Sequence, residues 1–131
     1  LGKEFPQDRG AYPMEDLEKI AEHYQGAGCT FLVAEDEKKI VGTCGVKRED
    51  SKTAILRRLF VDPSCRGKGV GTRLLKEALE FCRAQGFREV IIRTSSRMEQ
   101  AIKLCCSLGF KEQGSWTLGE VTLVRYHLKL T

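Results

Sequence analysis

The chain has 131 residues, of which 31% are charged and 41% are hydrophobic, and its formal net charge is +4. This length predicts one domain, residues 1–131, that can bury a single core, and the composition is ordinary for a globular protein. No apolar stretch approaches the ~20 residues of a membrane-spanning helix, so we expect no membrane partner. The basic residues do not interleave with aromatic ones, which argues against a nucleic-acid partner.

The cysteines do not form a metal-binding pattern. None of them belongs to a Cys-x-x-Cys pair, and only His23 and His127 could add imidazole ligands; the six are Cys29, Cys44, Cys65, Cys82, Cys105 and Cys106. A zinc site needs four ligands at organised spacing, so we expect no metal. Reduced thiols predict a cytoplasmic protein. The chain begins with Leu1 and Gly2, without an initiator Met, so it fits a fragment or a processed protein.

Hydrophobic periodicity and turn residues give the expected elements in chain order. They are a helix over 13–25, strands over 31–35, 40–47 and 53–61, a helix over 72–84, a strand over 89–94, a helix over 98–107, and a terminal pair of strands ending with 121–130. The strand–helix–strand unit between 53 and 94 predicts a parallel crossover. The fold class is therefore α/β, with a mixed, mostly antiparallel central sheet and helices on both faces.

The most informative segment is Arg66-Gly67-Lys68-Gly69-Val70-Gly71, between an expected strand and an expected helix. Glycines at such a turn let backbone N–H groups converge without obstruction by Cβ atoms. The first-turn N–H groups of the helix and its dipole add positive character. The segment therefore predicts a site for a phosphate or pyrophosphate.

The loop differs from two common phosphate loops and resembles a third. It lacks the Gly-Lys-Ser/Thr ending of a nucleoside-triphosphate loop and the Gly-x-Gly-x-x-Gly spacing of a dinucleotide turn. Arg66, Gly69 and Gly71 match Arg/Gln-x-x-Gly-x-Gly/Ala, the pyrophosphate loop of the GNAT N-acetyltransferase superfamily. Val61-Asp62-Pro63 before the loop and residues 101–110 after it also resemble that superfamily.

The resemblance implies an acyl-CoA N-acyltransferase fold that is short at its N-terminus, without the usual first strand and first helix. It implies acetyl-CoA as co-substrate and a primary amine as acceptor, namely a small amine, an amino acid or a peptide. The acetyl group would pass by direct attack in a ternary complex. We expect a monomer or a homodimer.

The resemblance also assigns the cofactor site. The N–H groups of residues 66–72, with Arg66 and Lys68 beside them, would bind the pyrophosphate; the expected residues are Arg66, Gly67, Lys68, Gly69, Val70, Gly71 and Thr72. The strand end Leu59-Phe60-Val61 would pair with the pantetheine arm. A bulge there would direct the N–H of Phe60 or Val61 at the thioester oxygen.

The proton-transfer residues depart from the superfamily pattern. Cys105 stands where a tyrosine often acts as general acid, and Met98 stands where asparagine is common. Cys105 is therefore the candidate acid, although packing in the core is the commoner role of a cysteine on a helix. Substitutes for the acid are Ser95, Ser96 and Tyr126.

The base and the acceptor contacts are also left open by the sequence. Ile55 replaces the strand glutamate that is often found in the superfamily, which leaves Glu35, Glu49, Glu120 and His23 as candidate bases. Arg57 or Arg58 would bind a carboxylate of the acceptor, or else pair with acidic neighbours across the sheet. Strand neighbours point to opposite faces, so at most one of the two would face the acceptor.

Two other functions fit the same residues. An acyl-CoA-binding regulatory module would explain the missing tyrosine and glutamate. A nucleotide-binding protein could use the glycine loop for another diphosphate.

Overall fold

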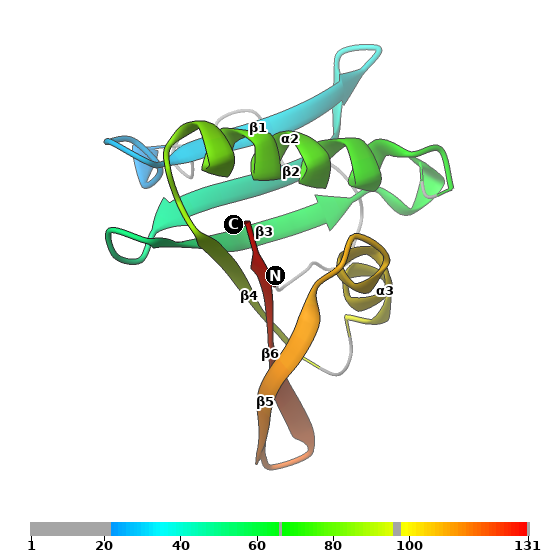
Figure 1. Ribbon diagram of the computed structural model, residues 1–131. Coiled ribbons are helices and arrows are strands. Elements are labelled where there is room, and N and C mark those ends of the chain that lie inside the picture. The colour runs from blue at the N-terminus through cyan, green and yellow to red at the C-terminus, as the bar shows by residue number, and fades with distance from the viewer. Residues whose placement is uncertain (1–21, 66, 96–97, 131) are drawn as a thin grey trace.

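The computed structural model describes residues 22–65, 67–95 and 98–130, and these form a single mixed sheet with helices packed on it (Figure 1). The strands are β1 (Thr30–Asp36), β2 (Lys39–Arg48), β3 (Thr53–Val61), β4 (Glu89–Ser95), β5 (Lys111–Leu118) and β6 (Val121–Lys129). The helices are α2 (Val70–Ala84), α3 (Glu99–Ser107) and the short 3-10 helix η1 (Pro63–Cys65). The predicted elements from residue 31 onward are confirmed. Of the helix predicted over 13–25, the part up to Ala21 lies outside the described residues.

The strands lie in the order β1-β2-β3-β4-β6-β5. Only β3 and β4 pair in parallel, and every other neighbouring pair is antiparallel. The chain passes from β3 through α2 to β4, so the parallel crossover is confirmed, and with it the mixed, mostly antiparallel sheet.

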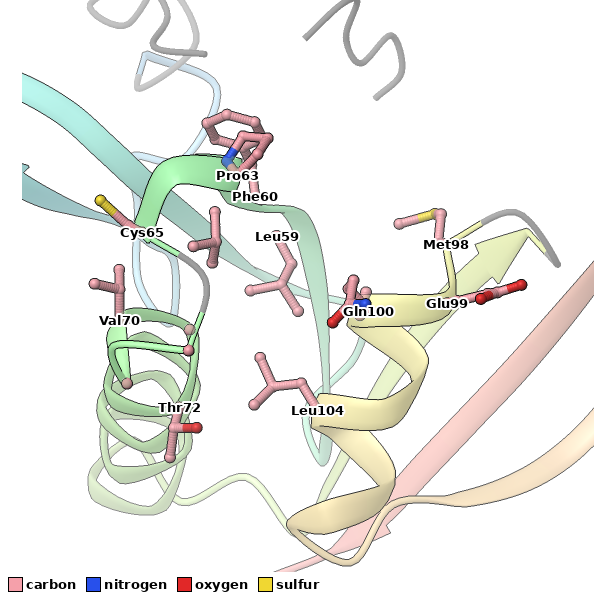
Figure 2. A pocket seen from close by; sticks show the side chains of 15 residues that line it. Leu59, Phe60, Pro63, Cys65, Val70, Thr72, Met98, Glu99, Gln100 and Leu104 are labelled. Carbon is pink, nitrogen blue, oxygen red and sulfur yellow. The ribbon is translucent and has the colours of Figure 1, made fainter. Parts of the chain in front are cut away.

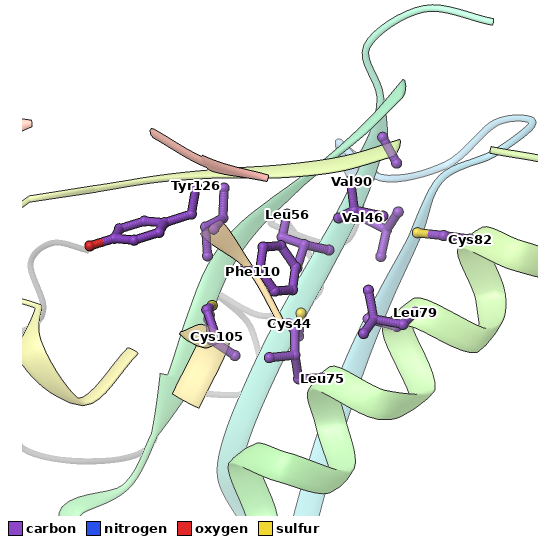
Figure 3. Packing of buried hydrophobic residues seen from close by; sticks show 14 of the residues in the cluster. Cys44, Val46, Leu56, Leu75, Leu79, Cys82, Val90, Cys105, Phe110 and Tyr126 are labelled. Atoms are coloured by element: carbon purple, nitrogen blue, oxygen red, sulfur yellow. The ribbon is translucent and has the colours of Figure 1, made fainter. Parts of the chain in front are cut away.

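Helices α2 and α3 pack on the same face of this sheet. The apolar side of α2 is buried, because its hydrophobic residues recur every three or four positions: Leu74, Leu75, Ala78, Leu79 and Cys82. Cys105 from α3 joins the same cluster, together with Cys44, Leu56 and Phe110 from the sheet side (Figure 3). On the opposite face, a Cβ at Gly45 would meet the ring of Tyr24, which places Tyr24 against that face.

The parallel pair opens part-way along its length. β3 and β4 pair only from Thr53 with Glu89 to Leu56 with Ile92. Beyond this point β3 continues to Val61 and β4 to Ser95, and the two strands diverge (Figure 1). We call this divergence the splay. It leaves one edge of the β3 end without a β4 partner, which is where a ligand could add main-chain hydrogen bonds.

Within the residues that the structure describes, no helix is both long enough and apolar enough to cross a bilayer.

Candidate active site

A cavity of about 790 Å³ opens beside the splay, between the N-terminal ends of α2 and α3 (Figure 2). This volume lies within the ~300–1,000 Å³ typical of small-molecule sites. Leu59 and Leu104 project into the space between the two helices (Figure 2). The lining residues come from three segments: Leu59, Phe60, Val61, Pro63 and Cys65; Gly67, Gly69, Val70, Gly71 and Thr72; and Met98, Glu99, Gln100, Ala101 and Leu104.

The glycines of the loop are required for two different reasons. Gly67 and Gly69 have φ angles of 84° and 83°, in the left-handed region that favours glycine, and a Cβ on either would meet no protein atom within 4 Å. Gly71 is needed for packing, because a Cβ there would lie 2.9 Å from Leu104 Cδ2 and 3.1 Å from Val61 Cγ2. Gly71 thus lets the start of α2 approach both β3 and α3, while Gly67 and Gly69 face open space.

The N-terminus of α2 offers backbone donors to the cavity. Gly69 is the N-cap of α2, and since glycine has no side chain, it cannot cap the first-turn amides with a side-chain oxygen. At this end of α2, Arg73 N donates a backbone hydrogen bond to Gly69 O at 3.0 Å. The backbone amides of Gly71 and Thr72 have no acceptor among the described residues. Free first-turn amides and the positive end of the helix dipole suit an anionic group.

A short turn connects the end of β3 to this loop. The Asp62 carboxylate accepts hydrogen bonds from Ser64 N and Ser64 Oγ, both at 2.9 Å, and its second oxygen lies 3.6 Å from Lys39 Nζ. Burial acts to raise the pKa of Asp62, but these hydrogen bonds and the Lys39 charge outweigh it and hold the pKa below its ordinary value. The buried Asp62 carboxylate is therefore charged at neutral pH, and it fixes the start of η1.

The bulge that the sequence predicted near the end of β3 is present. Thr43 pairs with Phe60 and Gly45 pairs with Arg57, so Arg58 and Leu59 together lie opposite the single residue Cys44. Arg58 has a φ of 54°, which is rare for a residue with a side chain. The buried Thr43 donates from Oγ1 to Arg58 O at 2.6 Å and so holds the bulged carbonyl in place.

Thr43→Val keeps the side-chain shape but removes the hydrogen bond to the bulge, and we expect it to reduce both stability and turnover. An unsatisfied carbonyl costs about 1–3 kcal/mol, and a displacement of about 1 Å at a reacting centre can cost about 100-fold in rate. Thr94→Val is a matched control, because Thr94 is also buried and donates to Val124 O at 3.3 Å. Thermal melting and acetyl-transfer rates distinguish the two. A turnover loss equal in both variants would contradict a special role for the bulge.

Most of the predicted cofactor residues line the cavity. Leu59, Phe60 and Val61 line it from β3, and the loop supplies Gly67, Gly69, Val70, Gly71 and Thr72. Lys68 is exposed beside the loop and is not among the lining residues. Arg66 lies outside the described residues.

The N-terminal half of α3 also lines the cavity, which the sequence reasoning missed. Met98, Glu99, Gln100, Ala101 and Leu104 contribute from this helix, and Pro63 and Cys65 from the turn before the glycine loop. The resemblance of residues 101–110 to a known superfamily was the available signal. That resemblance indicates the family but does not by itself place the helix beside the loop.

Cys105 lies in the hydrophobic core, and the structure does not bring its thiol into the cavity. Burial, with a smaller effect from Cys106, raises its pKa from 9.0 to about 12. The thiol is therefore neutral at physiological pH and packs as a small hydrophobic group. Leu104, the preceding residue, is the one that reaches the cavity.

We expect Cys105→Ala to cost about 1 kcal/mol in stability, because it removes a buried sulfur, and to leave turnover within about two-fold of the original. Steady-state rates at saturating acetyl-CoA, with a melting curve of the same sample, check this. A general acid normally contributes about 100-fold or more. A loss of that size in a folded variant would show that the Cys105 thiol takes part in catalysis.

The other proton-transfer candidates are scattered. Tyr126 is buried in the core cluster, and burial raises its pKa. His23, Glu35 and Glu120 are exposed, and none of them lines the cavity. Glu49 Oε2 lies 3.8 Å from Arg93 Nη2. Ser95 also lies outside the cavity lining, and Ser96 is not described.

Neither Arg57 nor Arg58 lines the cavity, and both side chains are exposed. The six cysteines are free thiols. Among the described side chains, no group of three or more His, Cys, Asp and Glu residues is placed to hold a metal ion.

Comparison with known proteins agrees with this geometry. Residues 1–110 match the model of the acetyltransferase (GNAT) family. The chain belongs to the GNAT family. The family match covers β1 to β4, α2, α3 and the glycine loop that precedes α2.

Relatives of known description are N-acetyltransferases. Human N-acetyltransferase 8B is 39% identical over 105 residues, a match covering 76% of this chain and 46% of the relative. N-acetylaspartate synthetase of Xenopus tropicalis is 35% identical over 101 residues, covering 76% of this chain and 37% of the relative. The chain thus spans less than half the length of these two relatives.

Solved structures share the fold. An acetyltransferase of the GNAT family from Staphylococcus aureus Mu50 superposes with a TM-score of 0.77 at 27% identity, over 90% of this chain and 78% of that one. An acetyltransferase from Salmonella typhimurium, solved with its cofactor acetyl-CoA, gives a TM-score of 0.76 at 23% identity, over 92% of this chain and 75% of that one. The predicted GNAT-like fold is confirmed.

Proposed function

We propose that this chain is an acetyl-CoA-dependent N-acetyltransferase that acetylates a primary amine. The observation that carries the proposal is the cavity in which a bulged strand end, a glycine loop at a helix N-terminus and α3 meet. The resemblance to N-acetyltransferases over most of the chain supports the reaction. The names of two relatives, N-acetylaspartate synthetases, favour an amino acid over a peptide as acceptor.

In this proposal the cofactor lies along the path from the glycine loop to the splay. The amides of Gly69, Val70, Gly71 and Thr72 bind the pyrophosphate, and the positive charges of Lys68 and Arg66, which precede them in the sequence, add to the attraction. The pantetheine arm adds along the part of β3 that extends past its pairing with β4, at Leu59, Phe60 and Val61. The amide of Phe60 or Val61 stabilises the thioester oxygen as it gains negative charge.

The reaction then needs little acid–base assistance from the protein. The neutral amine attacks the thioester carbon, a C–N bond forms, and the C–S bond breaks as CoA departs as a thiolate. The amine loses one proton to solvent or to a carboxylate reached through water. Since Cys105 lies in the core, we assign the bulge and the loop a larger part in catalysis than any single side-chain acid.

The experiment is a transfer assay with acetyl-CoA and a panel of primary amines, in which release of free CoA and mass of the acetylated amine are both followed. Acetylated product above the hydrolysis background supports the proposal. Binding of acetyl-CoA without product from any amine would instead favour the regulatory module. The assay uses reduced protein without added metal.

A further inference from the structure

Three arginines lie side by side on adjacent strands at the start of the splay. Arg93 on β4 is directly opposite Arg125 on β6. Arg57 on β3 and Arg93 each follow by one residue the last parallel pair, Leu56 with Ile92. Paired neighbouring strands are about 4.8 Å apart, which applies to Arg93 and Arg125, while Arg57 lies across the point where β3 and β4 begin to separate. We call Arg57, Arg93 and Arg125 the arginine row.

The arginine row lies on the face opposite α2 and α3. Leu56, Ile92 and Val124, the residues just before the three arginines, belong to the core cluster under the helices. Because side chains alternate along a strand, the arginines that follow them point to the other face. The bulge does not disturb this, since Arg57 keeps the regular pairing with Gly45. Arg57 and Arg93 are exposed and Arg125 is half-buried.

The positive charge of the row is only partly compensated within the described part of the chain. Arg93 has Glu49 at 3.8 Å, and Arg125 Nε donates to the neutral Gln113 Oε1 at 2.8 Å. The guanidinium of Arg57 has no recorded partner among the described residues. Like charges directly opposite each other destabilise a sheet, so a row of this kind is suited to binding an anion.

The arginine row lies on the side of the splay from which an acceptor amine would approach the cofactor. The cofactor cavity lies among Leu59, Gly69 and Leu104, on the helix side of the splay. An amine that attacks a thioester held there must approach from the side that the cofactor and the helices leave open. The row borders the splay on that side, within one residue of the point where β3 and β4 separate.

We propose that the arginine row binds a carboxylate of the acceptor and thereby makes an amino acid with an acidic side chain the preferred substrate. This inference rests on the proposed N-acetyltransferase function. Planar guanidinium groups bind carboxylates through paired hydrogen bonds, which fix orientation as well as distance. The row therefore holds the acceptor with its amino group directed into the splay, and Arg93 and Arg125 join Arg57 as specificity residues.

The test compares L-aspartate, L-asparagine and the diamide of L-aspartic acid, which share one skeleton and carry two, one and no carboxylates. For the unmodified protein we expect kcat/KM to fall along this series, by about tenfold for each carboxylate lost. Arg57→Gln and Arg93→Gln should each lower kcat/KM for L-aspartate about tenfold or more and leave the diamide within about two-fold. The preference should also weaken as salt is added.

Arg83→Gln is the matched control, because Arg83 is also exposed and lies 3.3 Å from a glutamate, Glu80, but sits on α2. It should keep the full preference. An unchanged melting shift with acetyl-CoA shows that each variant is folded. Equal kcat/KM values for L-aspartate and its diamide would contradict the proposal that the arginine row binds a carboxylate of the acceptor. So would a preference for L-aspartate that is unchanged in Arg57→Gln and Arg93→Gln.

A separate binding arm distinguishes the two proposals. L-aspartate is added to the complex with CoA, and the melting temperature is measured in the unmodified protein and in Arg93→Gln. A shift that needs Arg93 supports the anion site whether or not any amine is acetylated. The absence of any product in the rate arm would count against the transferase function alone.

Discussion

Gly69→Ala is expected to weaken acetyl-CoA binding about 100-fold. Gly69 has a φ of 83° and lines the cavity, so in the proposed binding mode a methyl group there would occupy the space of a pyrophosphate oxygen. Displacing the pyrophosphate from two backbone amides removes two charge-assisted hydrogen bonds of about 1.5 kcal/mol each, or about 100-fold in affinity. Titration calorimetry with acetyl-CoA measures this loss directly.

The fold provides a close control for this substitution. Gly86, at the other end of α2, has a φ of 87°, and like Gly69 it has no atom within 4 Å of an added Cβ. Gly86→Ala should therefore cost the same backbone strain, about 1 kcal/mol, and leave the affinity for acetyl-CoA unchanged. Equal affinities in the two variants would show that the loop does not contact the cofactor.

Leu75→Ala should destabilise the protein by about 3 kcal/mol, which lowers the melting temperature by roughly 10 °C. The Leu75 side chain is completely buried, in the same cluster as Cys44 and Phe110 (Figure 3). Its removal leaves a cavity beneath the helix whose N-terminus carries the glycine loop. Chemical denaturation of both proteins gives the difference in free energy of unfolding.

Lys76→Ala on the same helix is exposed and should change stability by less than about 0.5 kcal/mol. Acetyl-CoA at 100 times its Kd should add about 2.7 kcal/mol to both variants. A loss in Leu75→Ala no larger than that in Lys76→Ala would contradict the packing of α2 on the sheet.

The sequence was sufficient where a feature depends on local chemistry. The turn from β3 to α2 was predictable, because Gly67, Gly69 and Gly71 occupy alternate positions between a strand pattern and a helix pattern. The alternation and spacing of apolar residues located the strands and helices to within a few positions. The family resemblance added the expectation of a bulge at the end of β3, but not the residues that form it.

Features that depend on pairing between distant segments were not predictable. The bulge includes Arg58 because Thr43, on another strand, fixes its carbonyl, and no local pattern near residue 58 encodes that contact. The exposure of both Arg57 and Arg58 follows from the same bulge, which interrupts the alternation that the sequence argument assumed. Arg93 and Arg125 become neighbours only through the register of β4 and β6.

Cys105 illustrates a limit of transferring roles by position. It occupies the place of a family tyrosine, but a thiol is much shorter than a phenol, so it remains under the helix among the core residues. Leu104 and the first turn of α3 form the wall of the cavity instead. The resemblance at this position therefore did not predict which side chain of α3 faces the cavity.

Acetyl-CoA binding is tested most directly by the change in melting temperature when acetyl-CoA is added, with ADP as the control ligand. A ligand at 100 times its Kd adds about 2.7 kcal/mol, which is easily measured as a shift of several degrees. We predict a much larger shift with acetyl-CoA than with ADP. Equal shifts would identify a plain nucleotide site, and no shift with saturating acetyl-CoA would contradict acetyl-CoA binding in the cavity.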